Sequence, residues 1–144
     1  MNLSMRDIYV PACKKSIQCL PLFGSAVPAG FPSLADDYIE RNIDLNHYLI
    51  KNPISTFFVL ASGNSMKEAG INNGDILIVD KAANYLNGSI VIAVVNSEFN
   101  LKRLKISEGK IFLIPENNSC SPIEVNEEKG VEIWGVVTYS IHAL

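Results

Sequence analysis

The stretch from residue 75 to residue 95, DILIVDKAANYLNGSIVIAVV, decides the fold class. It contains two apolar runs, at 76–79 and 90–95, that are rich in the β-branched residues Ile and Val. A continuous apolar run of this length is typical of a strand that is buried on both faces of a sheet. The sequence therefore predicts two core strands, over residues 75–80 and 89–95.

The β pattern continues on both sides of this stretch. The pair Asn96-Ser97 separates the second run from another strand, which is typical of a hairpin turn. We expect about seven strands in all and find no internal repeat, so the fold class is mainly β with a short helical segment. The remaining expected strands cover residues 56–61, 98–106, 110–115, 122–125 and 131–141.

Residues 34–51 show helical spacing instead. Ser33 followed by Asp36 resembles a capping box, and Asp44 is a candidate cap for a second turn. Asn52-Pro53 ends the segment, because the residue before a proline avoids the helical region. This pattern predicts one bent helix or two short helices over 34–51.

The N-terminal segment has an unusual composition. Residues 16–35 carry no charge, which raises the question of a membrane span, but they include three prolines and two glycines. These residues favour an extended arm with turns over a spanning helix. A signal peptide is the alternative: Lys14 and Lys15 would be its charged region and Val27-Pro28-Ala29 its cleavage site.

Composition excludes several classes of protein. With 144 residues, 48% hydrophobic and 19% charged, the chain is long and apolar enough for one domain with a core. Its three cysteines are typical of free thiols in a reducing compartment, and we expect a cytoplasmic protein. Neither a GxxxxGK[ST] nor a GxGxxG loop occurs, which disfavours nucleotide enzymes of those two types.

Charge separates the chain into two parts. Residues 1–29 contain three basic residues and one acidic residue (+2), whereas residues 30–144 contain nine basic and fourteen acidic residues (−5). Because nucleic-acid affinity depends largely on basic contacts, we expect no direct, specific DNA binding by the acidic part. Any link to DNA would then run through a partner protein.

Ser65 is the first candidate for catalytic chemistry. It lies in Ala61-Ser62-Gly63-Asn64-Ser65-Met66, directly after an expected strand, and Gly63 permits a sharp turn. A serine nucleophile needs such an accessible hydroxyl beside backbone N–H groups that can hold an oxyanion. A Gly-x-Ser string is also common in ordinary turns, so the string alone leaves both interpretations open.

A serine nucleophile also needs a base. The two histidines, His47 and His142, lie on an expected helix and near the C-terminus, so a Ser-His-Asp triad has little support. Lysine can replace histidine when apolar surroundings favour its neutral form, since its ordinary pKa is about 10.4. Strand alternation places Lys102 on the face of Leu104 and Ile106. A strand studded with lysines to prevent aggregation explains the same pattern.

Several motifs in this order resemble the LexA/UmuD-type family of self-cleaving serine peptidases, and most closely its UmuD-like branch. The resemblance spans roughly residues 20–140, with Lys102 located 37 positions after Ser65. Asn64 stands where the family usually has Asp. The matching segments are Phe31-Pro32-Ser33, Asp37-Tyr38, and residues 41–46, 61–66, 74–80, 88–93, 99–104, 113–117, 121–123 and 135–137.

The resemblance implies a site and a fold. Ser65 would be the nucleophile, Lys102 the general base, and the backbone N–H groups of Ser65 and Met66 the oxyanion donors. The bond that is cut would be Ala29-Gly30, which divides the chain into an N-terminal arm (1–29) and a LexA-like peptidase domain of the β-clip type (30–144). The family implies no cofactor and no metal.

The family also implies partners. UmuD-like proteins act in the SOS response to DNA damage, where a RecA filament on single-stranded DNA stimulates their self-cleavage. The shortened form is a homodimer that joins a Y-family, UmuC-like polymerase subunit in translesion synthesis. Only 29 residues precede the expected bond, too few for the DNA-binding domain of the LexA-like branch.

Two alternatives remain at this point. The chain could be a binding module that keeps the fold while the dyad is idle. It could also be a secreted domain whose arm is removed by signal peptidase. These alternatives differ from self-cleavage in the role of Ser65.

Overall fold

A computed structural model describes residues 2–3, 8–9, 19–23, 39–115 and 121–144. The chain divides into two units, one formed by Met1–Pro11 and Asn52–Leu144 and the other by Ala12–Lys51. Each unit is described by itself. The expected boundary between residues 29 and 30 lies outside the described residues and stays a prediction.

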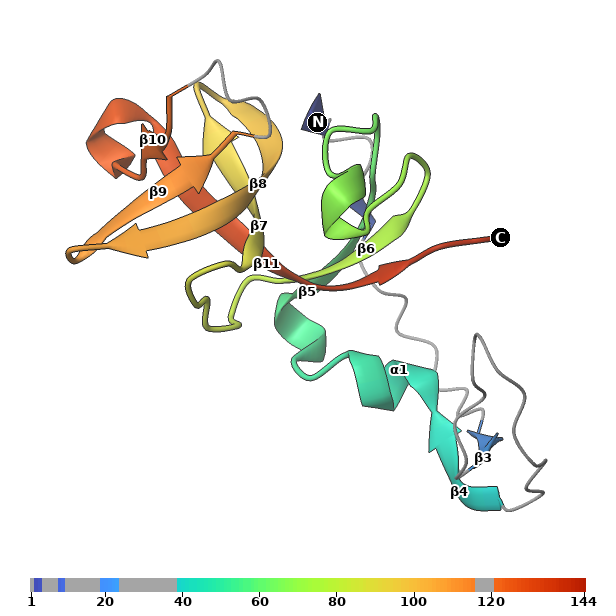
Figure 1. The fold of residues 1–144 in the computed structure, drawn as a ribbon. Coiled ribbons are helices and arrows are strands. Elements are labelled where there is room, and N and C mark those ends of the chain that lie inside the picture. The colour runs from blue at the N-terminus through green and yellow to red at the C-terminus, as the bar shows by residue number, and fades with distance from the viewer. Residues whose placement is uncertain (1, 4–7, 10–18, 24–38, 116–120) are drawn as a thin grey trace. The chain divides into compact units, whose positions relative to one another are not determined.

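The larger unit is built around one curled antiparallel sheet (Figure 1). Its strands follow the order β10-β9-β8-β7-β11-β6-β5-β2, and β1 pairs with β8 beside this path. The mainly β class is therefore confirmed. The strands are β1 (Asn2–Leu3), β2 (Ile8–Tyr9), β5 (Thr56–Leu60), β6 (Ile76–Asp80), β7 (Ile90–Val95), β8 (Glu98–Ser107), β9 (Lys110–Ile114), β10 (Ile123–Glu124) and β11 (Val131–Ile141).

The seven strands expected after residue 55 all occur, with ends that differ by at most one residue. The predicted hairpin joins β7 to β8, where Val95 pairs with Glu98. Asn96 and Ser97 both have positive φ, 50° and 66°, as a two-residue turn between twisted strands requires. A second tight turn at Glu108-Gly109, which the sequence analysis did not identify, joins β8 to β9.

The core of this unit consists of two groups of buried apolar side chains. Cluster 1 includes Met66, Leu77, Ile92 and Leu101, each with no exposed surface. Trp134 packs against cluster 1 and makes ring contacts with Phe57 and Phe99. Cluster 2 combines Val91, Ala93, Leu104, Leu113, Val131 and Val136. In β6, residues 77–80 are all buried, as the DILIVD pattern predicts, whereas Ile76 in the same run is 39% exposed.

Asp80, at the end of β6, binds the segment that precedes β5. Its carboxylate accepts hydrogen bonds from the Ser55 hydroxyl (2.6 Å), the Asn52 amide (2.7 Å) and the Ala82 backbone N–H (2.8 Å). Burial alone would raise the pKa of Asp80, but these hydrogen bonds outweigh it and hold the pKa below the ordinary value. Asp80 is therefore a structural carboxylate, charged at neutral pH.

The smaller unit contains a two-stranded sheet of β3 (Cys19–Phe23) and β4 (Ile39–Asp44), followed by the five-residue helix α1 (Leu45–Leu49). The predicted cap is confirmed, since the Asp44 carboxylate accepts from the Asn46 amide at 3.1 Å. The helix expected over 34–51 is wrong for residues 39–44, which form β4. Antiparallel pairing with β3 overrides the local helical spacing there. Ser33, Asp36 and the rest of 34–38 lie outside the described residues.

Candidate functional site

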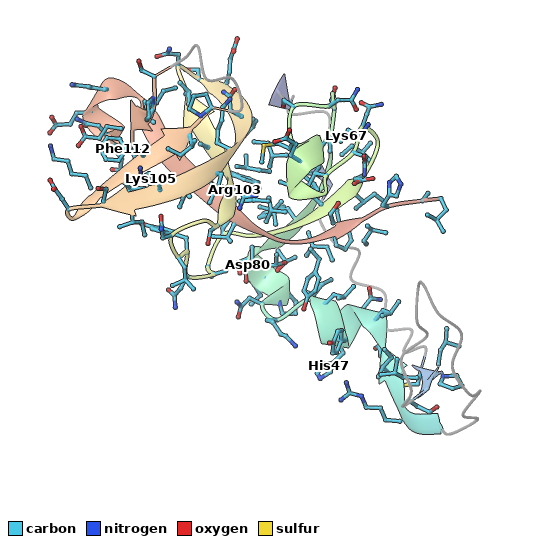
Figure 2. The ribbon with its side chains drawn as sticks, in the orientation of Figure 1. His47, Lys67, Asp80, Arg103, Lys105 and Phe112 are labelled. Carbon is cyan, nitrogen blue, oxygen red and sulfur yellow. The ribbon has the colours of Figure 1, made fainter. Side chains whose placement is uncertain are left out.

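Ser65 lies in an exposed turn that follows β5. The Lys67 amide donates to the Asn64 carbonyl oxygen at 3.2 Å, which makes Ser65 and Met66 the two central residues of the turn. A short 3-10 helix, Lys67–Ala69, continues from it, and Lys67 is labelled in Figure 2. Gly63 has a φ of +88°, so the expected sharp turn with a special glycine conformation is confirmed.

Met66 anchors this turn in the core. Its side chain has no exposed surface and belongs to cluster 1. The Met66 carbonyl oxygen accepts from the amides of Ala69 (3.0 Å) and Ile71 (3.1 Å). A buried side chain and two backbone bonds at position 66 therefore fix the backbone next to Ser65, while Ser65 itself stays at the surface.

The whole loop from residue 61 to residue 75 is closed at its base. The Ala61 amide donates to the Asp75 carbonyl oxygen and the Gly74 amide to the Ala61 carbonyl oxygen, both at 2.8 Å. Within the loop, the Asn73 side chain accepts from the Gly63 amide at 2.8 Å. These contacts hold the segment that leads into the Ser65 turn in one conformation.

Lys102 lies in the middle of β8 and is half-buried. It pairs across the ladder with Val91 of β7, so their side chains share a face of the sheet. Val91 and Leu104 belong to cluster 2 and are almost fully buried. The expectation that Lys102 lies against apolar surface is therefore met. Figure 2 labels its neighbour Arg103, which donates to the Gly88 carbonyl oxygen at 2.7 Å.

The structure brings together the residues that flank the two candidates. Met66, next to Ser65, and Leu101, next to Lys102, are both members of cluster 1. The Ser65 turn and the centre of β8 are thus tied to the same part of the core. The roles of Ser65 and Lys102, and of the Ser65 and Met66 amides as oxyanion donors, stay predictions. Ala29 and Gly30 lie outside the described residues.

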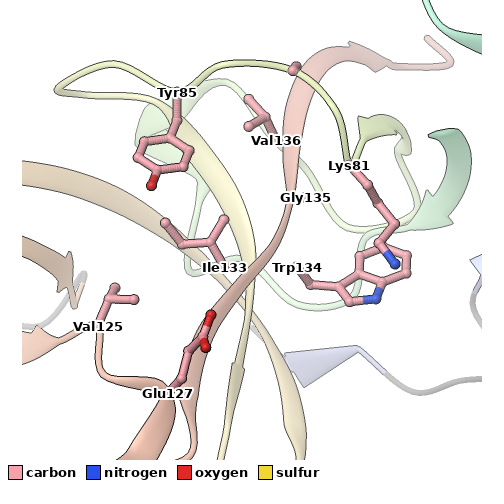
Figure 3. Close-up of a pocket in the computed structure, with 9 residues that line it drawn as sticks. Lys81, Tyr85, Val125, Glu127, Ile133, Trp134, Gly135 and Val136 are labelled. Atoms are coloured by element: carbon pink, nitrogen blue, oxygen red, sulfur yellow. The ribbon is translucent and has the colours of Figure 1, made fainter.

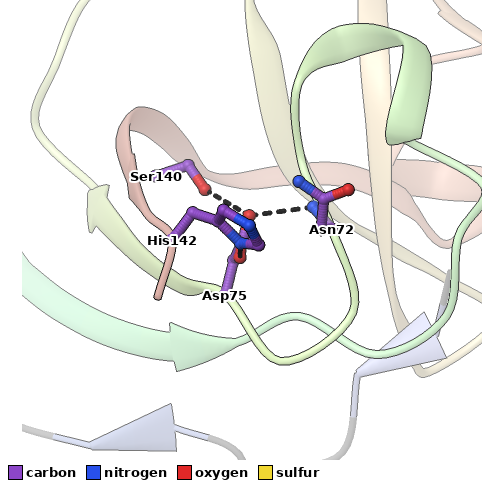
Figure 4. Close-up of polar contacts among 4 residues, drawn as sticks. All are labelled: Asn72, Asp75, Ser140 and His142. Carbon is purple, nitrogen blue, oxygen red and sulfur yellow. Dashed lines mark hydrogen bonds and ion pairs between the residues drawn. The ribbon is translucent and has the colours of Figure 1, made fainter. Parts of the chain in front are cut away.

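A polar network beside the loop was missed by the sequence analysis (Figure 4). The Asp75 carboxylate, 2% exposed, contacts three groups: the Asn72 backbone N–H (2.8 Å), the Ser140 hydroxyl (3.0 Å) and His142 Nδ1 (2.6 Å). Asp75 and His142 are 67 positions apart in the sequence, and no local pattern links them. The one available signal was an acidic residue placed directly before a buried strand.

The charge of Asp75 follows from these contacts. Burial disfavours the carboxylate and would raise its pKa. The hydrogen bonds from Asn72, His142 and Ser140, together with the attraction of His142, outweigh burial and hold the pKa of Asp75 below its ordinary value of 3.8. Asp75 is therefore ionised at neutral pH and acts as an acceptor of hydrogen bonds.

A pocket of about 170 Å³ lies in another part of the larger unit (Figure 3). Trp134, Tyr85 and Glu127 are among its lining residues, and neither Ser65 nor Lys102 lines it. Lys81 also lines the pocket, with its ammonium nitrogen 5.0 Å from the centre of the Trp134 ring. The pocket is therefore not formed by the two candidate catalytic residues.

Two absences apply to the described part of the chain. Its helices include none that is long and apolar enough to cross a membrane. Its His, Cys, Asp and Glu side chains form no group of three or more that could hold a metal ion.

Comparison with known proteins supports one family. Residues 21–138 match the family model described as Peptidase S24-like. Protein SamA from Salmonella typhimurium is 48% identical over 122 residues, covering 85% of this chain and 84% of SamA. Protein MucA from Escherichia coli is 35% identical over 94% of this chain and 92% of MucA. The LexA repressor of Hahella chejuensis is 38% identical over 91% of this chain and 65% of the repressor.

Proposed function

The chain belongs to the Peptidase S24-like family, and we propose that it is a serine peptidase that cleaves its own backbone at Ala29-Gly30 through Ser65 and Lys102. One observation carries the proposal. The turn that presents Ser65 and the strand that bears Lys102 are anchored in the same hydrophobic cluster through Met66 and Leu101. The relatives add support, because SamA and MucA match this chain over most of its length.

The proposed reaction proceeds in two steps. Neutral Lys102 takes the proton of the Ser65 hydroxyl as Oγ attacks the Ala29 carbonyl carbon, and the carbonyl oxygen gains a negative charge. The backbone N–H groups of Ser65 and Met66 stabilise that oxyanion. The Lys102 ammonium then protonates the Gly30 nitrogen as the carbon–nitrogen bond breaks, leaving Ala29 as an ester on Ser65.

Water completes the cycle. Lys102, neutral again after the first step, removes a proton from a water molecule that attacks the ester carbon. The bond between Ala29 and Ser65 Oγ breaks, and Oγ recovers the proton from Lys102. The products are residues 1–29 with a new carboxylate and residues 30–144 with a new amino group. No cofactor is needed.

The biological role that we propose lies in the SOS response. A RecA filament on single-stranded DNA would stimulate the cleavage, and the shortened form, as a homodimer, would serve as accessory subunit of a Y-family translesion polymerase. The charge distribution supports an indirect link to DNA. Residues 30–144 carry nine basic and fourteen acidic residues, a poor composition for binding phosphates directly.

The dyad is tested by the rate of self-cleavage at alkaline pH, where lysine is more often neutral. We expect Ser65→Ala and Lys102→Ala each to lower the rate of self-cleavage by about 100-fold or more. The first change removes the nucleophile, and the second removes the base that takes its proton. Lys105→Ala is the matched control, since Lys105 is an exposed lysine on the same strand, and it should cleave at the parent rate.

The alternatives predict other outcomes. Removal of the arm by signal peptidase in cells would continue in Ser65→Ala, which contradicts self-cleavage. A parent protein that stays intact at alkaline pH and with a RecA filament would indicate a binding module with an idle dyad. A parent that is cut only when the filament is added supports both the dyad and the proposed stimulation, provided that Ser65→Ala stays intact in the same mixture.

A further inference from the structure

The end of β11 makes a specific contact with the loop that carries Ser65. Ser140 Oγ and His142 Nδ1 both reach the carboxylate of Asp75, at 3.0 Å and 2.6 Å (Figure 4). Ser140 and His142 are alternate residues of the chain, so both side chains can approach from one side of an extended backbone. Two polar groups near the C-terminus therefore converge on one buried acid.

Asp75 in turn holds the base of the loop. Its Oδ2 accepts from the Asn72 amide at 2.8 Å, and its own amide donates to the Asn72 carbonyl oxygen at 3.1 Å. Its carbonyl oxygen accepts from Ala61, the first residue of the loop, at 2.8 Å. One residue thus joins the two ends of the loop and fixes the segment at Asn72.

Ile71 and Asn73, the residues on either side of Asn72, connect this hydrogen-bond network to the turn that contains Ser65. Asn73 accepts from the Gly63 amide at 2.8 Å, two positions before Ser65. Ile71, which is 2% exposed, donates its amide to the Met66 carbonyl oxygen at 3.1 Å, one position after Ser65. The turn that presents Ser65 is held on both sides by residues adjacent to Asn72.

We propose that the C-terminal end of β11 acts as a latch, that is, a contact that holds the loop of residues 61–75 in place. In this latch His142 and Ser140 orient Asp75, and Asp75 acts as a positioning residue for Ser65. The inference rests on the proposed function of Ser65. A buried carboxylate that lost these donors would keep its charge with fewer hydrogen bonds, which is costly. The loop would then relax at its base, and Ser65 would spend less time in the geometry that attack requires.

The half-exposed position of His142 makes the latch testable without breaking the core. Its side chain is 48% exposed, so His142→Ala removes a contact and leaves no buried cavity. His142→Asn is the conservative variant, because the amide nitrogen of asparagine can donate from the place of Nδ1. His47→Ala, on α1 of the other unit, controls for the loss of a histidine as such.

Two measurements are made on the full chain of each variant: the self-cleavage rate constant and hydrogen exchange of the amides in residues 61–75. We expect His142→Ala to cleave about five-fold more slowly and to exchange the Asn72 amide about five-fold faster, as loss of one hydrogen bond from a half-exposed side chain predicts. His142→Asn should recover most of the cleavage rate and most of the protection of the Asn72 amide from exchange. His47→Ala should match the parent in both measurements.

The outcomes separate the latch from the proposed function. If Ser65→Ala cleaves as fast as the parent, the dyad is wrong, and the exchange data still decide whether His142 holds the loop. If the parent cleaves through Ser65 but His142→Ala changes neither rate nor exchange, the latch is wrong. Faster exchange throughout β7 and β9 as well would assign His142 to global stability and would also overturn the proposal.

Discussion

Met66 and Leu101 lie in the same buried cluster, and neither side chain exposes any surface. One follows Ser65 directly in the chain, and the other precedes Lys102. Through these neighbours, the turn of Ser65 and the middle of β8, which are 37 positions apart in the sequence, meet the same part of the core. The core therefore fixes the backbone next to each candidate residue, while the Lys102 side chain points to the opposite face of β8 from Leu101, beside Val91.

Gly63→Ala tests the importance of the turn before Ser65. An added Cβ would meet nothing within 4 Å, so the cost comes from the φ of +88° and not from a clash. We expect a loss of about 1–2 kcal/mol in the free energy of unfolding, together with slower self-cleavage.

The matched control for this prediction is Gly109→Ala in the β8–β9 turn, where φ is +75° and the space is also open. Denaturant unfolding should show a similar loss of stability in both variants. The cleavage rate should fall only in Gly63→Ala. Equal rates in the two variants would mean that the turn at Gly63 does not position Ser65.

Gly135→Ala tests the packing of β11 on β6. An added Cβ would lie 2.6 Å from Val79 Cγ1, and Val79 is fully buried. Because valine is stiff at χ1, we expect overpacking to cost about 1–3 kcal/mol. The double variant Gly135→Ala/Val79→Ala should lose less stability than the sum of the single changes. Strict additivity in urea unfolding would contradict this contact.

Stability should fall in acid because of Asp75 and Asp80. The pKa of each carboxyl is below the ordinary value in the folded chain, so each contributes stability above that value, about 3.8. This contribution is lost as the pH falls through the lower folded pKa values. The free energy of unfolding should therefore be nearly constant from about pH 7 to 5 and decrease below about pH 4.

Asp80→Asn should reduce this acid dependence, since the asparagine amide does not titrate and contributes no pKa difference between the folded and unfolded chain. Glu132→Gln, an exposed position on β11, is the control and should keep the parent profile. Unfolding is measured by circular dichroism in urea at each pH. An unchanged slope below about pH 4 in Asp80→Asn would contradict the assignment.

The sheet of the larger unit can be predicted from the sequence because the signals for its strands are local. The runs at 76–79 and 90–95 and the Asn96-Ser97 turn contain the information for β6, β7 and the hairpin. Residues 39–44 were assigned to a helix because β4 depends on pairing with β3, whose partner residues lie about twenty positions away along the chain. Local spacing does not contain that information.

The candidate site, too, has some features that local sequence signals predict and others that depend on long-range contacts. Ser65 could be placed in a turn from Gly63 and the preceding strand, and Lys102 on an apolar face from alternation. The contact between Asp75 and His142 could not be predicted, because it joins the start of β6 to the end of β11. The sequence indicates only that His142 is structural or solvated rather than catalytic, and the fold brings it to Asp75.

The masses of the products after alkaline incubation show whether Ser65 cleaves the chain at Ala29-Gly30. We expect the parent to yield two species of 29 and 115 residues, the larger beginning at Gly30, and Ser65→Ala under the same conditions to remain at the mass of the intact 144-residue chain. The same two species from Ser65→Ala at the parent rate would contradict the claim that Ser65 is the nucleophile.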